Sequence, residues 1–393
     1  MPESGDRSPL QNRAKFGSAK LGKPRILIPP SMNIRCRAAA AFLSLVAGHL
    51  LAQPPVSITT SAPATPAAPG PPAVPLTPAE VVKANRNNLV FVQGTNGAGS
   101  GFIARLGGVN FLFTNAHVAA GVRGAGFKTL DGTQVQIGAA SIAVGHDIFR
   151  LLVAQGGKPL EVMDHVDENA SIDDEVVVLG NAEGGGVINT IKGKIVGIGP
   201  NLVEVDAPFV PGNSGSPIIH LKTGKVIGVA TYLIIKDYDP ATHQAIRQPR
   251  IRRFGYRVDS VKTWQPVNWA AFFAQANELE NVEKLTDDLG RVLMDLAKHH
   301  DITPNLHNNP AIKTQIDWWT ANTRGGHGSP RDAARADQNF IAGLKSLSQS
   351  DILAARQHIT YDYFVHNLNE QQQQRKALSD VFDQILQEMR KIQ

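Results

Sequence analysis

The sequence predicts a mainly β protein in which two six-stranded antiparallel β-barrels precede an α-helical C-terminal region. Between residues 85 and 235, short apolar or alternating runs rich in Val, Ile and Phe are separated by turn residues. This pattern is typical of barrels and sandwiches, and the runs fall into two groups of about six strands each. After Asp259 the pattern becomes helical, because apolar residues recur at steps of three and four from Val282 to Leu296.

The composition suggests four segments. We expect an N-terminal extension with a signal peptide over residues 1–52, a Pro-rich linker over 53–80, the two-barrel domain over 81–262 and a helical domain over 263–393. The linker has too few large apolar residues to build a core, and its prolines favour extended geometry.

The N-terminal extension carries the features of an export signal that starts at Met32. Arg35 and Arg37 precede an apolar stretch, Ala38 to Ala52, which is too short to span a bilayer comfortably. We therefore expect a periplasmic or secreted protein with no stable membrane span after signal cleavage; a cytosolic protein with an apolar patch is the alternative. The single cysteine, Cys36, lies in this segment, so the rest of the chain forms no intramolecular disulfide, which favours a bacterial source.

The distribution of charge argues against nucleic-acid binding. The whole chain has a formal net charge of +5, but residues 1–37 hold eight of the 39 basic and only two of the 34 acidic residues. The remainder is close to neutral, so it offers no basic surface of the kind that binds phosphate backbones. We expect polypeptide partners instead, and the sequence does not define the oligomeric state.

A serine between glycines is the strongest chemical signal. In Gly212-Asn213-Ser214-Gly215 the small residues allow a sharp turn that exposes the hydroxyl and aims backbone N–H groups at one spot, where an oxyanion could be held. A serine hydroxyl is a weak nucleophile, so it needs a base and a group that orients the base. His117 and Asp147 lie upstream, although Asp131, Asp173 or Asp174 are alternatives for the acid.

Several segments around these residues resemble the trypsin-like serine proteases of the chymotrypsin fold, especially the bacterial heat-shock (Htr-type) branch, without a recognisable PDZ domain. The similar segments are GSGFI before the histidine, TNAHV, HDIFRLLV, DEVVVLGN and DAPFVPGNSGSP. The order histidine, aspartate, serine is also that of chymotrypsin. The resemblance covers roughly residues 85 to 260 and departs from the family pattern at four positions: Phe149, Arg150, Val210 and Ser216.

The resemblance implies a role for each site residue. Ser214 would attack the scissile carbonyl, His117 would take and return its proton, and Asp147 would orient the imidazole. The backbone N–H groups of Gly212 and Ser214 would form the oxyanion hole.

The substrate pocket is expected to be walled by residues before the serine and on a later strand, namely Val210, Pro211, Val229, Ala230 and Thr231. Six residues before the serine stands Pro208 rather than an acid. We therefore expect small or medium apolar side chains to be accepted rather than Lys or Arg. No cofactor and no metal is expected, because His299, His300, Asp301 and His307 match no strong ligand spacing.

Two functions follow from these features. The first is an exported serine endopeptidase that works through an acyl-enzyme intermediate. The alternative is a latent or inactive protease-fold binding protein that acts through its helical C-terminal domain. Whether the Ser214 hydroxyl reacts as a nucleophile distinguishes these two functions.

Overall fold

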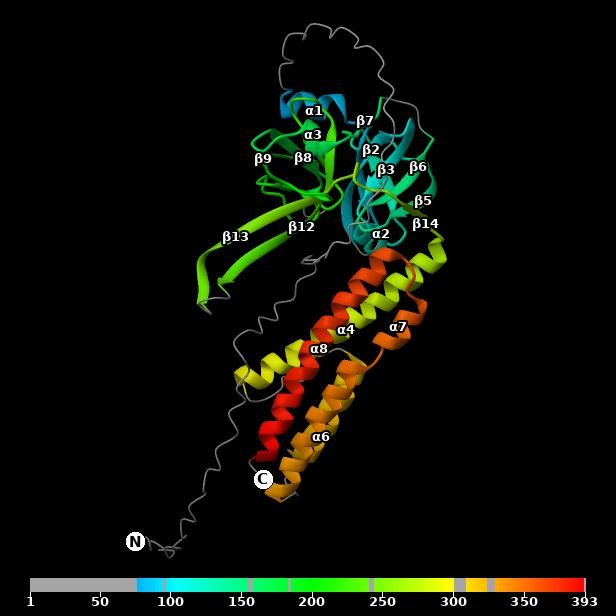
Figure 1. Cartoon of the computed structure of the whole chain (residues 1–393). Helices are drawn as coiled ribbons and strands as arrows, with labels where there is room; N and C mark the ends of the chain where they lie inside the picture. Colours follow the sequence, from blue (N-terminus) through cyan, green and yellow to red (C-terminus); the bar gives the residue numbers. More distant parts are fainter. Residues whose placement is uncertain are drawn as a thin grey trace, which may run out of the picture.

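The computed structural model describes residues 76–94, 97–154, 158–182, 185–239, 244–299, 309–323 and 329–391. Two β units lie side by side, and a group of long helices extends away from one of them (Figure 1). The expected signal peptide and nearly all of the expected linker lie outside the described residues. Within the described part of the chain, no helix has the length and apolar character needed to cross a membrane.

The second β unit is a closed six-stranded barrel, which confirms one of the two expected barrels. Its strands pair in the order β10-β13-β12-β11-β8-β9. The core consists of alternating apolar residues, and Val176, Val178, Ile218 and Ile227 are fully buried. The six strands are β8 (Glu175–Gly180), β9 (Asn189–Ile198), β10 (Leu202–Val205), β11 (Pro217–His220), β12 (Val226–Asp239) and β13 (Gln244–Tyr256).

The first β unit is an eight-stranded sheet, so the expected second six-stranded barrel is not confirmed. Its main path runs β14-β5-β6-β3-β2-β1-β4, and β7 pairs with β2. The outer edge of β5, through which closure onto β4 would run, is partly occupied by β14, a strand that comes after the closed barrel. The strands are β1 (Leu89–Gln93), β2 (Ala98–Leu106), β3 (Val109–Thr114), β4 (Gly126–Thr129), β5 (Ile137–Ala143), β6 (Phe149–Val153), β7 (Leu160–Glu161) and β14 (Trp264–Pro266).

Three short helices accompany the strands: α1 (Pro78–Ala84), α2 (Ala116–Gly121) and α3 (Val166–Asn169). The start of α1 was expected from Thr77-Pro78-Ala79-Glu80 and is confirmed. The Thr77 side chain accepts a bond from the Glu80 N–H, and the Glu80 carboxylate accepts one from the Thr77 N–H.

The last two strands of the closed barrel continue beyond it as a two-stranded ribbon (Figure 1). The sequence suggested a long loop over 238–248, and this expectation is wrong for most of the segment. Tyr238 pairs with Ala245 and Asp239 with Gln244, so the strands continue almost to the tip. Val, Ile and Tyr on β12 favour a strand strongly enough to override the nearby turn residues.

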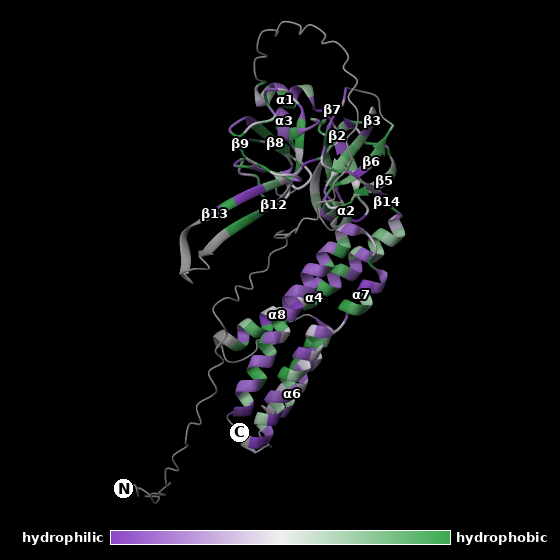
Figure 2. Ribbon diagram, viewed as in Figure 1, coloured by the Kyte–Doolittle hydropathy of each residue, from purple (hydrophilic) through white to green (hydrophobic). Residues whose placement is uncertain are grey.

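The C-terminal region is helical, as expected. Its helices are α4 (Trp269–His299), α5 (Pro310–Thr323), α6 (Pro330–Gln349), α7 (Ile352–His358) and α8 (Asp362–Lys391). The apolar seam of α4 packs with residues such as Phe340 and Phe382 from α6 and α8. Hydrophobic residues are interspersed with hydrophilic ones along these helices (Figure 2). The last two helices are separated between His358, where α7 ends, and Asp362, where the continuous α8 begins.

A buried arginine connects the helices. Arg375 of α8 is only 2% exposed and donates to the Val282 carbonyl and the Thr286 hydroxyl of α4. It also donates to the Leu347 carbonyl of α6 and pairs with Asp351 before α7. Because a buried guanidinium is costly unless its donors are used, these bonds fix how the helices meet.

Candidate active site

His117 and Asp147 are brought together, as the sequence predicted. His117 is the second residue of α2, directly after β3, and Asp147 lies in the turn between β5 and β6. One carboxylate oxygen of Asp147 accepts the His117 backbone N–H at 3.0 Å, and the other lies 2.6 Å from His117 Nδ1. The Asp147 side chain is 12% exposed, whereas that of His117 is 38% exposed, so the imidazole remains open to solvent.

The pair changes the acidity of the histidine. Burial is the largest single influence and lowers the pKa of His117. The negative charge of Asp147 and its hydrogen bond together outweigh burial, so the pKa of His117 is raised above its ordinary value. The same contact fixes Nδ1 as the protonated nitrogen of the neutral ring, which leaves Nε2 as an acceptor.

The other candidate acids contact different groups. Asp131 accepts bonds from Thr129 and Thr133, and Asp174 pairs with His220 at 3.1 Å. His146, which had no role in the sequence, bonds the Val144 carbonyl through Nδ1 and the Ser260 hydroxyl through Nε2. Burial lowers the pKa of His146, and its two hydrogen bonds join the turn that contains Asp147 to Ser260.

Ser214 lies on the loop between β10 and β11, where two glycines set the backbone. Gly212 and Gly215 have φ values of +93° and +88°. A Cβ on Gly215 would lie 2.0 Å from the Ser100 carbonyl oxygen, so only glycine fits there. The Ser214 hydroxyl donates to the Thr231 carbonyl at 3.3 Å, and in the described part of the chain no hydrogen bond joins it to His117.

Two residues connect the serine with the histidine–aspartate pair. The buried amide of Asn115 donates to the Asp147 backbone carbonyl at 2.6 Å and to the Thr231 hydroxyl at 3.0 Å. The backbone carbonyl of Thr231 in turn accepts the Ser214 hydroxyl. Neither connection was expected from the sequence, where Thr231 is predicted only in the pocket. The signal for Asn115 is a polar residue directly before the apolar helix that carries His117.

Ser100 fixes the nucleophile loop from the neighbouring sheet, and the sequence analysis missed it. Its N–H donates to the Ser214 carbonyl at 2.9 Å, and its hydroxyl donates to the Gly212 carbonyl at 3.0 Å. The same hydroxyl accepts the Asn181 N–H at 2.8 Å. Among the described residues, no acceptor is recorded for the N–H groups of Gly212 and Ser214, the two expected oxyanion donors.

Asn213 and Ser216 are fully buried on either side of the half-buried Ser214. The Asn213 amide oxygen accepts the Val210 N–H at 3.0 Å. Ser216 stands where the family has a second glycine, and its hydroxyl faces Gly180, where an added Cβ would lie 1.9 Å from it. The extra hydroxyl therefore fits because residue 180 has no side chain.

The five expected pocket residues differ in exposure. Val229 and Ala230 are fully buried in the barrel, Thr231 is buried, Val210 is half-buried and Pro211 is exposed. Ala230 contributes through its backbone, since its carbonyl accepts the Gly215 N–H and its N–H donates to the Ser216 carbonyl. That these five residues select the substrate stays a prediction.

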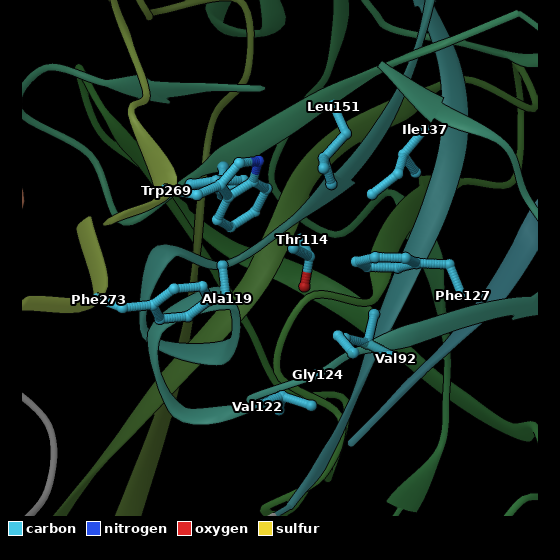
Figure 3. A pocket seen from close by; sticks show the side chains of 12 residues that line it. Val92, Thr114, Ala119, Val122, Gly124, Phe127, Ile137, Leu151, Trp269 and Phe273 are labelled. Carbon is cyan, nitrogen blue, oxygen red and sulfur yellow. The ribbon is translucent and has the colours of Figure 1, made fainter. Parts of the chain in front are cut away.

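A cavity of about 190 Å³ lies behind α2 and does not include the three site residues. Its walls come from the N-terminal sheet, from Ala119 of α2 and Val122 directly after that helix, and from Trp269 and Phe273 of α4 (Figure 3). The lining is almost wholly apolar, so this cavity is not where the chemistry of the triad residues would take place.

A closed barrel that presents a glycine-flanked serine, beside a sheet that holds a histidine–aspartate pair, defines the trypsin-like class of peptidase domains. In agreement, residues 99–229 match the family model of the trypsin-like peptidase domain. The similarity to this family covers about a third of the chain.

Two known proteins show further similarity. A mitochondrial protein of Arabidopsis thaliana described as protease Do-like 3 is 33% identical over 178 residues, which cover 40% of this chain and 29% of that protein. This chain thus spans less than a third of that relative's length. The crystal structure of the serine endoprotease from Yersinia pestis aligns over 47% of this chain and 63% of that one, with 20% identity and a TM-score of 0.34, too low to support an argument.

Proposed function

We propose that the protein is a serine endopeptidase that hydrolyses peptide bonds through Ser214, His117 and Asp147. The observation that carries the proposal is the double contact of the Asp147 carboxylate, which binds both the backbone N–H and the Nδ1 of His117. A solvated strand-end acid has no reason to engage both groups, whereas an acid that orients a catalytic imidazole does.

The proposed reaction has two halves. The Ser214 hydroxyl oxygen bonds to the scissile carbonyl carbon while its proton moves to His117 Nε2, and the carbon–nitrogen bond then breaks as His117 gives that proton to the leaving amine. Water next attacks the acyl-enzyme, loses its proton to His117, and releases the acid when the proton returns to Ser214. Asp147 stabilises the imidazolium in both halves.

The oxyanion is proposed to be bound by the N–H groups of Gly212 and Ser214. Two observations support this assignment. Within the described residues neither N–H group donates to an acceptor, and the Ser100 hydroxyl donates to the Gly212 carbonyl, which fixes this part of the loop. Such donors lower the barrier by roughly 3–4 kcal/mol each at other sites.

A latent protease-fold binding protein is the second candidate, and one observation favours it. The Ser214 hydroxyl donates to the Thr231 carbonyl rather than to His117. Catalytic hydrogen bonds are often long or misaligned before substrate binds, so this geometry is also that of a resting enzyme.

Labelling with a fluorophosphonate probe tests the first proposal. We expect the folded protein to be labelled on Ser214 and the label to disappear in Ser214→Ala and in His117→Ala. Ser350→Ala, which changes a different exposed serine, is the matched control and should be labelled normally. A folded wild-type protein that takes no label would overturn the endopeptidase proposal and leave the latent one.

We further propose that the pocket formed by Val210, Pro211, Val229, Ala230 and Thr231 accepts small or medium apolar side chains. The support is the absence of an acid at Pro208 and the apolar character of four of the five residues, all except Thr231. Cleavage of a peptide library dominated by Lys or Arg would refute this preference.

Export is also part of the proposal. Its support is the arginine-flanked apolar segment from Met32 to Ala52, which lies outside the described residues. A bacterial host that expresses the full chain should yield a periplasmic or secreted product beginning at Gln53, as N-terminal sequencing would show. An uncleaved cytosolic product would refute export.

A further inference from the structure

The turn that carries Asp147 is contacted on both flanks by the helical region. On one side, the N–H of Gly145 donates to the Asp362 carboxylate at 2.7 Å, and Asp362 is the first residue of α8. On the other side, the centroid of the Phe149 ring lies 5.2 Å from the ring centroid of Phe272 and 5.4 Å from that of Trp269, both on α4. These contacts lie two residues before and two residues after the aspartate.

The turn has little packing of its own at Gly145. This residue is exposed, has a φ of +76°, and no atom lies within 4 Å of a Cβ placed on it. Its position therefore depends on hydrogen bonds to the backbone. The neighbouring Val144 N–H donates to the Thr263 carbonyl at 3.0 Å, also from the segment that follows the closed barrel.

Asp362 is itself held firmly enough to set the position of the turn. The Gln275 amide of α4 accepts the N–H groups of Thr360 and Tyr361, directly before α8. Phe364 is 1% exposed and lies 5.0 Å from Phe272. The start of α8 and the start of α4 thus form one packed unit beneath the turn.

Two departures from the family pattern coincide with this contact. Phe149 stands where the family usually has alanine, and its ring packs on Trp269 and Phe272 of α4. Arg150 stands where an apolar residue is usual, and its guanidinium lies 3.9 Å from the ring centroid of Trp264 on β14. Both unusual residues therefore contact the segments that follow the closed barrel.

We propose that the helical region positions Asp147 against His117, and that Asp362 is a positioning residue for the triad aspartate. The helices α4 and α8 then support the residues of the proposed active site and do not block access to it. The His117 side chain is 38% exposed and remains accessible to substrate. The inference rests on the proposed endopeptidase function, which it deepens.

The test compares Asp362→Ala with Asp362→Asn in the full chain. Both variants remove the same charge, but only asparagine keeps an oxygen that can accept the Gly145 N–H. Asp332→Ala is the matched control, because Asp332 is also a first-turn acid that caps a helix, α6, away from the site. We expect Asp362→Ala to lower kcat for a peptide substrate about 10- to 100-fold with little change in KM. Asp362→Asn should recover most of this loss, and Asp332→Ala should show none.

A second readout does not need activity. In a Ser214→Ala background, NMR titration of the His117 ring should show a lower pKa in Asp362→Ala than in Asp362→Asn. A carboxylate of Asp147 that has moved away from the ring raises the pKa of His117 less. Equal kcat and equal His117 titration in the two Asp362 variants would overturn the inference. If the wild-type protein hydrolyses nothing, the endopeptidase proposal fails, while the titration still decides whether Asp362 positions Asp147.

Discussion

The closed barrel and the N-terminal sheet differ in what completes their cores. Every strand of the closed barrel pairs on both sides, and neither hydrophobic cluster that contains barrel residues includes a residue of the helices α4 to α8. The sheet instead ends at β4 and β14, and its core includes Phe272 and Leu279 of α4 and Phe364 of α8. The serine therefore stands on a unit whose core excludes the long helices, whereas the histidine and the aspartate stand on one that the helices complete.

This difference predicts that the two β units respond differently to substitutions in the helical region. A sheet closed on itself satisfies its own edges, but an open one must be covered or paired. Changes in α4 and α8 should therefore disturb the histidine–aspartate pair more than the serine loop. Four substitutions test this comparison.

The largest effect is expected from Phe272→Ala. Phe272 is fully buried and contacts Phe149, Phe364 and Tyr361, so truncation should cost about 3–5 kcal/mol of stability. Hydrogen exchange should show lost protection in β5 and β6 with protection retained in β8 and β11. Equal loss in both sets of strands would show that the two β units unfold together and would break the comparison.

The second effect belongs to the closed barrel. Gly180→Ala would place a Cβ 1.9 Å from the Ser216 hydroxyl and 2.8 Å from the Asn213 amide. We expect a loss of about 1–3 kcal/mol in chemical denaturation and weaker labelling of Ser214. Adding Ser216→Gly should recover part of the loss, because it removes the nearest clash. Additive effects in this double-mutant cycle would contradict the close contact.

The third effect concerns pH and α4. Burial, helped by Asp287, Glu280 and Glu370, raises the pKa of Glu283 to about 7. Because the folded-state pKa exceeds the unfolded value, this group makes the fold less stable as pH rises from about 4.5 through 7. Glu283→Gln should therefore gain roughly 2 kcal/mol over wild type above pH 7 and nothing near pH 4.

Denaturation at both pH values measures this difference. Glu388→Gln, which changes an exposed acid of α8, is the matched control and should change little at either pH. A pH-independent gain for Glu283→Gln would rule out titration of this carboxyl as its cause.

The smallest effect is expected at the cavity. Ala119 lines it from α2, so Ala119→Leu should fill part of the 190 Å³ and raise stability by about 1 kcal/mol. Ala120→Leu, on the same helix but outside the lining, should bring no gain. A thermal melt compares the two, and equal melting temperatures would show that the cavity does not accept the added side chain.

The strands and the site residues were largely predictable from the sequence because their signals are local. Alternating Val and Ile runs gave the strands of both β units, and Gly212, Ser214 and Gly215 mark a turn that few other residues allow. His117 and Asp147 were identified by motif, and the structure places them in contact.

The remaining features depend on contacts between distant residues. Whether the first sheet closes is decided by β14, which pairs with β5 across more than a hundred residues of sequence. Asn115 and Ser100 lie within the TNAHV and GSGFI segments and Asp362 lies outside every family-like segment, but the hydrogen-bond partners of all three are on other elements. Phe149 and Arg150 were read as departures from a family pattern, because their aromatic partners on α4 and β14 could not be identified from sequence.

The position of Asp362 late in the chain has a consequence for synthesis. Domains tend to fold in the order in which they leave the ribosome. The closed barrel has all its strands once Tyr256 has emerged, but α8 begins only at Asp362. We expect a nascent chain stalled before Tyr361 to take no fluorophosphonate label and a chain extended past α8 to take it. The proposed active site would then become competent only after α8 has been translated, more than a hundred residues after the last strand of the closed barrel.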